Sequence, residues 1–128
     1  MSFGNMKIVL TSVMVDDQER VLRFYTGIPG FVKKTEIPMG EFKWLTVVPP
    51  EGAAAVELLL EPMGFPPAKV YQKALFDAGI PLTSFGIDDV RKEFERLQTR
   101  GGVFRLEPTQ MGPVTMAAFE TMATKMPR

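Results

Sequence analysis

The feature that most constrains this chain is a short phrase that occurs twice. LTSVMVDD begins at Leu10, and LTSFGIDD begins at Leu82. When residues 10–31 are aligned on residues 82–103 without a gap, Leu, Thr, Ser, Asp, Asp and Gly recur at the same places. A chain of 128 residues has room for one such repetition within one compact core. We therefore expect two similar modules that bury their apolar side chains together.

The apolar patterns of the two halves follow the same order. β-branched and apolar runs predict strands, and apolar stripes ended by Gly and Pro predict helices. In the first half, strands are expected at residues 7–15, 31–37, 42–48 and 55–61, with a helix after the first. In the second half, strands are expected at residues 81–87, 103–108 and 114–119, with a helix over 90–100. An amphipathic helix at about 67–78 connects the two halves.

The repeat also predicts where the second module ends. The offset between the two phrases maps Phe42 onto Val114 and places the counterpart of the fourth strand near position 127. The expected fold is therefore α+β, with duplicated βαβββ modules and a last strand that is missing or vestigial. We predict a single domain over residues 6–128, with modules at about 6–61 and 80–128, and a loose leader at 1–5. Dimerisation or strand exchange would cover the strand edge that the missing strand leaves unpaired.

Composition excludes several classes of function. Lys plus Arg and Asp plus Glu both number 15, so the formal net charge is zero, and no basic stripe points to nucleic acid. No apolar run approaches the roughly 20 residues that span a bilayer, so no membrane partner is expected. Cys is absent, which excludes disulfides and fits a cytoplasmic location. His is absent as well, so triads that need an imidazole base are excluded.

The chain resembles the vicinal oxygen chelate superfamily, which includes glyoxalase I, extradiol dioxygenases, and bleomycin and fosfomycin resistance proteins. The resemblance covers roughly residues 6–119 and is carried by the segments VMVDDQERVLRFYTGIPGF, VELLLEP and IDDVRKEFERLQTRGG, in their duplicated order. It implies that the two modules form a curled mixed sheet around a half-open pocket, often completed by a homodimer.

The same resemblance predicts which residues would bind a metal. In metal-dependent members, the ligands come from the first and last strands of each module. The first-strand positions fall on Leu10 and Leu82, which cannot bind a metal, and the fourth-strand position falls on Glu57. The last position falls at about 127–129, where the chain supplies no carboxylate, imidazole or thiolate. A transition metal needs three or more converging donors, so we expect neither a metal nor another cofactor.

Glu57 is the central candidate for chemistry, because strand alternation puts it on the opposite face from its neighbours Val56 and Leu58. On a pocket face its carboxylate would act as a general base or anchor a cationic or hydroxylated ligand. The alternative is a carboxylate that is solvated or paired with Arg or Lys. The whole predicted lining is apolar with hydroxyl groups, which suits a flat aromatic or amphipathic molecule; ordinary core packing is the alternative. It comprises Ser12, Met14, Trp44, Thr46, Glu57, Leu59, Ser84 and Met116.

Two pairs of aspartates, Asp16–Asp17 and Asp88–Asp89, suggest acid–base chemistry at first sight. Each pair stands at a strand-to-helix junction, where Asp caps free backbone N–H groups. Asp16 and Glu19 also have the spacing of a capping box. We therefore expect these aspartates to be structural.

These observations favour a metal-free protein that binds a small apolar or amphipathic molecule in a dimeric pocket. One alternative is a lyase, isomerase or dioxygenase-type enzyme that uses Glu57 as general base or sole metal ligand. Such an enzyme would have to stabilise developing charge with the hydroxyls of Thr46, Ser12 and Ser84. Another alternative is a degenerate paralogue whose main property is dimerisation. The identity of the ligand and the existence of any turnover stay open at this point.

Overall fold

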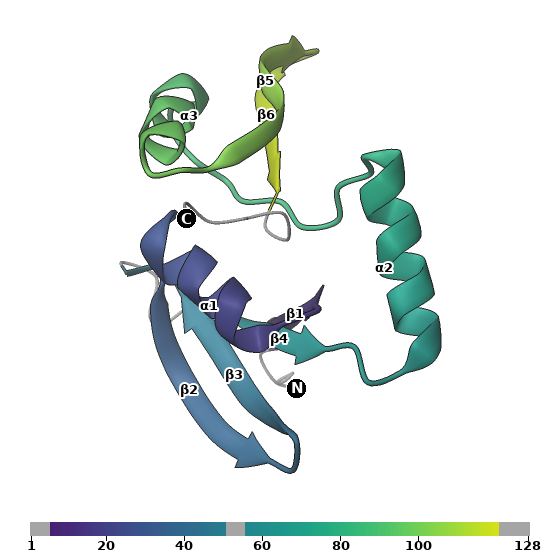
Figure 1. Ribbon diagram of the computed structural model, residues 1–128. Coiled ribbons are helices and arrows are strands. Elements are labelled where there is room, and N and C mark those ends of the chain that lie inside the picture. Colours follow the sequence, from purple (N-terminus) through teal and green to yellow (C-terminus); the bar gives the residue numbers. More distant parts are fainter. Residues whose placement is uncertain (1–5, 51–55, 121–128) are drawn as a thin grey trace, which may run out of the picture.

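The computed structural model describes residues 6–50 and 56–120, which form an α+β domain with three helices and two sheets (Figure 1). The strand order is β1-β4-β3-β2 in the first sheet, and β5 pairs with β6 in the second. The α+β prediction is confirmed, but the described strands form two sheets rather than one. The elements are β1 (Leu10–Val15), α1 (Gln18–Gly27), β2 (Val32–Met39), β3 (Phe42–Val48), β4 (Glu57–Pro62), α2 (Pro66–Ala78), α3 (Val90–Thr99), β5 (Val103–Met111) and β6 (Val114–Glu120).

The first sheet combines one parallel pair with antiparallel pairs. β1 runs parallel to β4, whereas β3 is antiparallel to both β4 and β2. The turn between β2 and β3 consists of Gly40 and Glu41, and Gly40 has a φ of 65°. Glycine adopts this conformation without the steric cost that a Cβ atom brings, and such turns match the twist of a hairpin. The strand predicted over residues 42–48 is confirmed with those bounds.

Helix α1 covers one face of this sheet and begins at an aspartate cap. The carboxylate of Asp17 accepts a hydrogen bond from the backbone N–H of Arg20 at 3.1 Å, which satisfies one of the free N–H groups of the first turn. The predicted capping box of Asp16 with Glu19 is wrong: the N-cap is Asp17, one residue further along the chain. Asp16 instead forms an ion pair with Arg20, and Glu19 forms one with Lys43.

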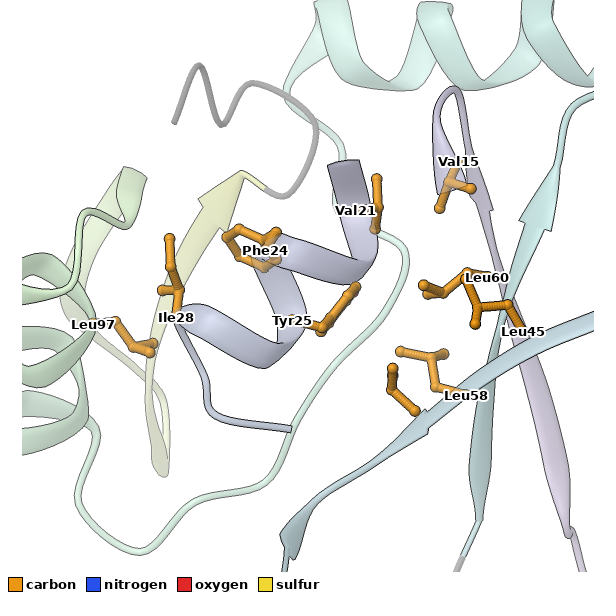
Figure 2. Packing of buried hydrophobic residues seen from close by; sticks show 10 residues of the cluster. Val15, Val21, Phe24, Tyr25, Ile28, Leu45, Leu58, Leu60 and Leu97 are labelled. Carbon is orange, nitrogen blue, oxygen red and sulfur yellow. The ribbon is translucent and has the colours of Figure 1, made fainter. Parts of the chain in front are cut away.

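The hydrophobic core lies on both sides of α1 (Figure 2). Val21 and Tyr25 point toward the sheet, whereas Phe24 and Ile28 point toward the second half, where Leu97 of α3 meets them. Tyr25 is 1% exposed, and burial raises the pKa of its phenol above the usual range. Full burial of a large apolar side chain stabilises a fold by about 1.5–3 kcal/mol. One helix therefore joins both halves into a single core.

The helix cap and the turn glycine of the first half recur in the second half, displaced along the sequence by the distance from Leu10 to Leu82. Helix α3 begins and ends at the positions that this offset assigns to the ends of α1. Asp89 caps it as Asp17 caps α1, by accepting from the backbone N–H of Lys92 at 3.1 Å. The turn between β5 and β6 contains Gly112, the counterpart of Gly40, with a φ of 62°. The helix and the two strands predicted for the second half over residues 90–119 are thus present, and β5 extends beyond its predicted end to Met111.

The strand predicted over residues 81–87 is not formed, and that prediction is wrong. In the first half the equivalent strand, β1, is paired with β4, and Leu10 lies opposite Glu57. Residues 81–87 have no partner strand in the described part of the chain, and Leu82 is 66% exposed. The predictions on residues 1–5 and on a last strand near 127 lie outside the described residues.

The predicted connecting helix is present as α2 and ends in a glycine motif. Gly79 has a φ of 72°, its N–H donates to the carbonyl of Phe76, and the N–H of Ile80 donates to the carbonyl of Leu75. This is a Schellman motif, which satisfies two carbonyls that the helix itself leaves free. The Arg105 guanidinium of β5 lies over the Phe76 ring at 4.3 Å and so links α2 to the second sheet. Within the described ranges, no helix is long and apolar enough to cross a membrane.

Candidate functional site

One face of the first sheet is turned away from α1. Register places Ser12 of β1 opposite Leu59 of β4, and Thr46 of β3 opposite both Leu59 and Thr35 of β2. Residues paired in register share a face, and the adjacent residue Leu58 belongs to the core under α1. We call the other surface the open face. It consists of Leu10, Ser12, Met14, Thr35, Ile37, Met39, Phe42, Trp44, Thr46, Glu57, Leu59 and Glu61.

The open face has a buried floor and an apolar, exposed rim. Thr46 is 0% exposed and Leu59 is 6% exposed, so both belong to the floor. Trp44 is 36% exposed and its register partner Ile37 is 51% exposed. Met39 continues this exposed apolar surface along β2. Single exposed apolar residues are ordinary, but a contiguous apolar patch beside a polar floor is typical of a binding surface.

Glu57 lies at one end of the open face and is held by two hydroxyl groups. The hydroxyl of Thr46 donates to Oε1 of Glu57 at 2.7 Å, and the hydroxyl of Thr35 approaches the same oxygen at 3.4 Å. Glu57 is partly exposed, and no ion pair between described residues involves it. The carboxylate is therefore oriented by its neighbours but not neutralised by a described cation.

The structure brings six of the eight predicted lining residues to this face and leaves two elsewhere. The six are Ser12, Met14, Trp44, Thr46, Glu57 and Leu59. Ser84 lies in residues 81–87, which form no strand, and Met116 lies on β6 of the second sheet, opposite Thr109. Within one chain, the residues of the second half thus do not join the open face as expected.

Thr35, which supplies the second hydroxyl to Glu57, is not among the residues predicted from the sequence. Its place depends on an irregularity in the β2–β3 ladder: Lys33 pairs with Val47, but Thr35 pairs with Thr46. The extra residue of β2 shifts the strand by one position and brings Thr35 onto the open face. Alternation counted from the start of a strand does not reveal such a bulge.

Gln18 was also missed, and it closes the sheet where β3 and β4 separate. Its Nε2 donates to the carbonyls of Lys43 and Leu60, both at 2.8 Å, and its Oε1 accepts from the N–H of Lys43 at 3.1 Å. Continuing the register of Thr46 and Leu59 by three residues places Lys43 opposite Pro62, which has no N–H to donate. The Gln18 amide therefore supplies the hydrogen bonds that the ladder lacks at this point.

Two basic residues of the first sheet, Lys33 and Lys43, lie on the face that α1 covers. Glu36 binds the Lys33 ammonium at 2.5 Å and the Lys43 ammonium at 2.7 Å, and Lys43 also reaches Glu19 at 2.7 Å. The hydrogen bonds from Lys33 and Lys43 lower the pKa of Glu36 to about 2. The hydrogen bonds to Glu19 and Glu36 raise the pKa of Lys43 above its usual range. This cluster is exposed and lies apart from Glu57.

The donor set around Glu57 does not fit a transition metal. Leu10 lies directly opposite Glu57 in the β1–β4 register, and a leucine side chain offers no ligand atom. Thr35 and Thr46 present neutral hydroxyls, which already bind the carboxylate. In the part of the chain that the structure describes, no group of three or more His, Cys, Asp or Glu side chains is arranged to hold a metal ion. We therefore assign no chemical step to a metal here.

A separate groove of about 560 Å³ runs between α2 and the far ends of β3 and β4. Two of its lining residues, Lys73 and Asp77, form an ion pair with each other, and a third, Asp16, is paired with Arg20 outside the lining. Phe42 is the residue that it shares with the open face. The groove lies at the opposite end of β4 from Glu57 and is lined by Asp16, Phe42, Pro62, Met63, Lys69, Gln72, Lys73, Phe76 and Asp77.

The fold and its open sheet face define a small α+β domain of the glyoxalase kind. The model of the Glyoxalase/Bleomycin resistance protein/Dioxygenase superfamily matches residues 7–124, and the chain belongs to this superfamily. The resemblance inferred from the repeated motif is confirmed.

Individual relatives bring the comparison closer. The chain is 51% identical over 115 residues to the uncharacterized protein YurT of Bacillus subtilis (strain 168), and the match covers 90% of this chain and 91% of YurT. The crystal structure of UcmS2 matches with a TM-score of 0.79 and 25% identity, over 91% of each chain. TnmS3, an antibiotic binding protein from Streptomyces sp. CB03234, matches with a TM-score of 0.66 and 28% identity, over 93% of this chain and 89% of its own.

Proposed function

We propose that this protein binds a small apolar or amphipathic molecule on the open face, without a metal ion. The observation that carries the proposal is the surface itself: exposed Trp44 and Ile37 share one sheet face with Glu57, a carboxylate that two hydroxyls orient. Ligand sites in proteins combine an apolar lining with a few placed polar groups in this way. The antibiotic-binding role of TnmS3 supports the same class of function for this chain.

We further propose that a second copy of the chain completes the pocket as a homodimer of duplicated modules. Two features support this. Among the described strands, β1 lies at the edge of the first sheet, so one side of its backbone has no described partner strand. Residues 81–87, which resemble β1 in sequence, form no strand, and Leu82 and Ile87 are 66% and 45% exposed. Pairing across two copies would bring Ser84 and Met116 of the partner to the open face, where the repeat predicts them.

The metal-free part of the proposal rests on donor chemistry. Leucines stand at both first-strand positions, Leu10 and Leu82, and the chain has no His or Cys. Glu57 alone supplies one ligand where a catalytic centre needs three or more. An enzyme of this superfamily would then depend on Glu57 as a general base, without a Lewis acid to stabilise the charge that develops.

The experiment is a titration followed by fluorescence of Trp44, the sole tryptophan. We expect aromatic and amphipathic compounds to quench or shift this emission, and chelator treatment to leave their affinity unchanged. Trp44→Phe serves as the control, because it removes the signal while equilibrium dialysis still reports binding. A compound that is turned over, with turnover lost in Glu57→Gln, would favour the enzyme instead. Binding that disappears with chelator would refute the metal-free proposal.

A further inference from the structure

We propose that the open face selects ligands that carry a protonated amine next to an apolar group, and that Glu57 holds the amine. This inference rests on the proposed binding function and names the chemical class of the ligand. It begins with the charges of the first sheet. Glu57 and Glu61 lie on the open face, whereas Lys33 and Lys43 lie on the face covered by α1. None of the residues that the register assigns to the open face is Lys or Arg; Lys34, at the bulge of β2, falls outside the register and is assigned to neither face.

The hydrogen bonds at Glu57 determine which ligand group fits. The hydroxyls of Thr46 and Thr35 are both directed at Oε1. Among the described residues, Oε2 has no hydrogen-bond or ion-pair partner. An ionised carboxylate only accepts hydrogen bonds, so the complementary ligand group is a donor, and an ammonium combines several N–H donors with the opposite charge. A charge-assisted bond of this kind is about twice as strong as a neutral one.

The strand geometry sets the spacing between the amine and the apolar part of the ligand. β4 rises by about 3.3 Å per residue, so Leu59 lies about 7 Å along the sheet from Glu57. Continuing the register of Thr46 and Leu59 places Trp44 opposite Glu61, about 13 Å from Glu57 along the strand. A ring joined to an amine by a few methylene groups spans from Glu57 across Leu59 toward Trp44.

A matched series of three compounds tests the inference: 4-phenylbutylamine, 4-phenylbutanol and 4-phenylbutyrate. They share the ring and the chain, and differ in carrying a cation, a neutral hydroxyl or an anion. Binding is measured by Trp44 fluorescence, excited where a phenyl ring does not absorb, and by equilibrium dialysis. We expect the amine to bind about 10-fold more tightly than the alcohol, and the carboxylate to bind most weakly.

Variants assign the preference to Glu57. Glu57→Gln keeps the shape but removes the charge, so the amine should lose about 10-fold in affinity while the alcohol changes little. Thr46→Val should reduce the ratio of amine to alcohol affinity several-fold through misplacement of the carboxylate, and Thr46→Ser should restore it. Glu95→Gln, at an exposed position on α3 outside the open face, is the control and should keep the ratio. Thr46 is in this respect a positioning residue.

Each outcome separates this inference from the proposed function. If alcohol and amine bind equally, or if Glu57→Gln leaves their ratio unchanged, amine recognition is overturned and small-molecule binding stands. If none of the three compounds binds by dialysis, both proposals are overturned. If Thr46→Val loses affinity for amine and alcohol alike, Thr46 acts on the fold of the face and the positioning role is refuted.

Discussion

Replacing Gln18 with alanine tests how β3 and β4 are held together at the point where their backbone hydrogen-bond ladder ends. We expect Gln18→Ala to lower the free energy of unfolding by about 2–3 kcal/mol, because the side chain makes three hydrogen bonds. They run to the carbonyls of Lys43 and Leu60 and from the N–H of Lys43. Each such bond contributes roughly 0.5–1.5 kcal/mol net, and partly buried backbone groups left without a partner cost more. Pro62 cannot replace the lost donor, because it has no N–H.

The assay is urea denaturation followed by far-ultraviolet circular dichroism, which gives the midpoint and its slope. Gln98→Ala is the matched control, because Gln98 is exposed on α3, and we expect it to change stability by less than about 0.5 kcal/mol. Gln18→Glu should lose nearly as much as the alanine variant, since it keeps an acceptor but removes the donor to both carbonyls. If Gln18→Ala loses no more than the exposed control, the bridging role of Gln18 is refuted.

Three further predictions concern the core, the surface charges and a turn. Leu60→Ala should cost about 2–5 kcal/mol in urea unfolding, because Leu60 is 0% exposed, whereas Val114→Ala, at a 55% exposed position, should cost less than about 1 kcal/mol. Glu36 has a folded pKa of about 2, below its ordinary value of 4.5, so its contribution is present above pH 4.5 and is lost as the pH falls toward 2. The stability difference between the protein and Glu36→Gln should therefore shrink over that window, and a constant difference would contradict it. Gly40→Ala should destabilise the protein by about 1–2 kcal/mol, because Gly40 has a φ of 65°. Gly27→Ala should not, because Gly27 has no positive φ and a Cβ atom added there would meet no atom within 4 Å.

The features predicted best from the sequence are those that depend on neighbouring residues. Asp17 and Asp89 cap helices and Gly79 ends α2, because these roles need only the few residues around them. Alternation along β4 was likewise enough to predict that Glu57 lies away from the core. The assignment of Asp16 as the cap was off by one, since two adjacent aspartates offer the same chemistry and only the backbone geometry distinguishes them.

Features that depend on distant partners could not be predicted from the pattern. Residues 81–87 resemble β1 in sequence, but a strand needs a neighbouring strand with which to share hydrogen bonds. The sequence of the segment does not show whether such a neighbour is present. The hydrogen bonds of Thr35 depend on a bulge in the ladder, and those of Gln18 depend on the position of Pro62 across the sheet. Within one chain, Ser84 and Met116 are absent from the open face for the same reason: the two halves do not share a sheet.

Native mass spectrometry of the purified, untreated protein tests the central claim most directly, since it reports assembly, bound metal and bound organic molecules together. We predict the mass of two chains without a metal ion, and the addition of one 4-phenylbutylamine per chain after incubation with it. One tightly held transition-metal ion per chain would contradict the conclusion drawn from Leu10, Leu82 and Glu57 and would return the protein to metal-dependent chemistry.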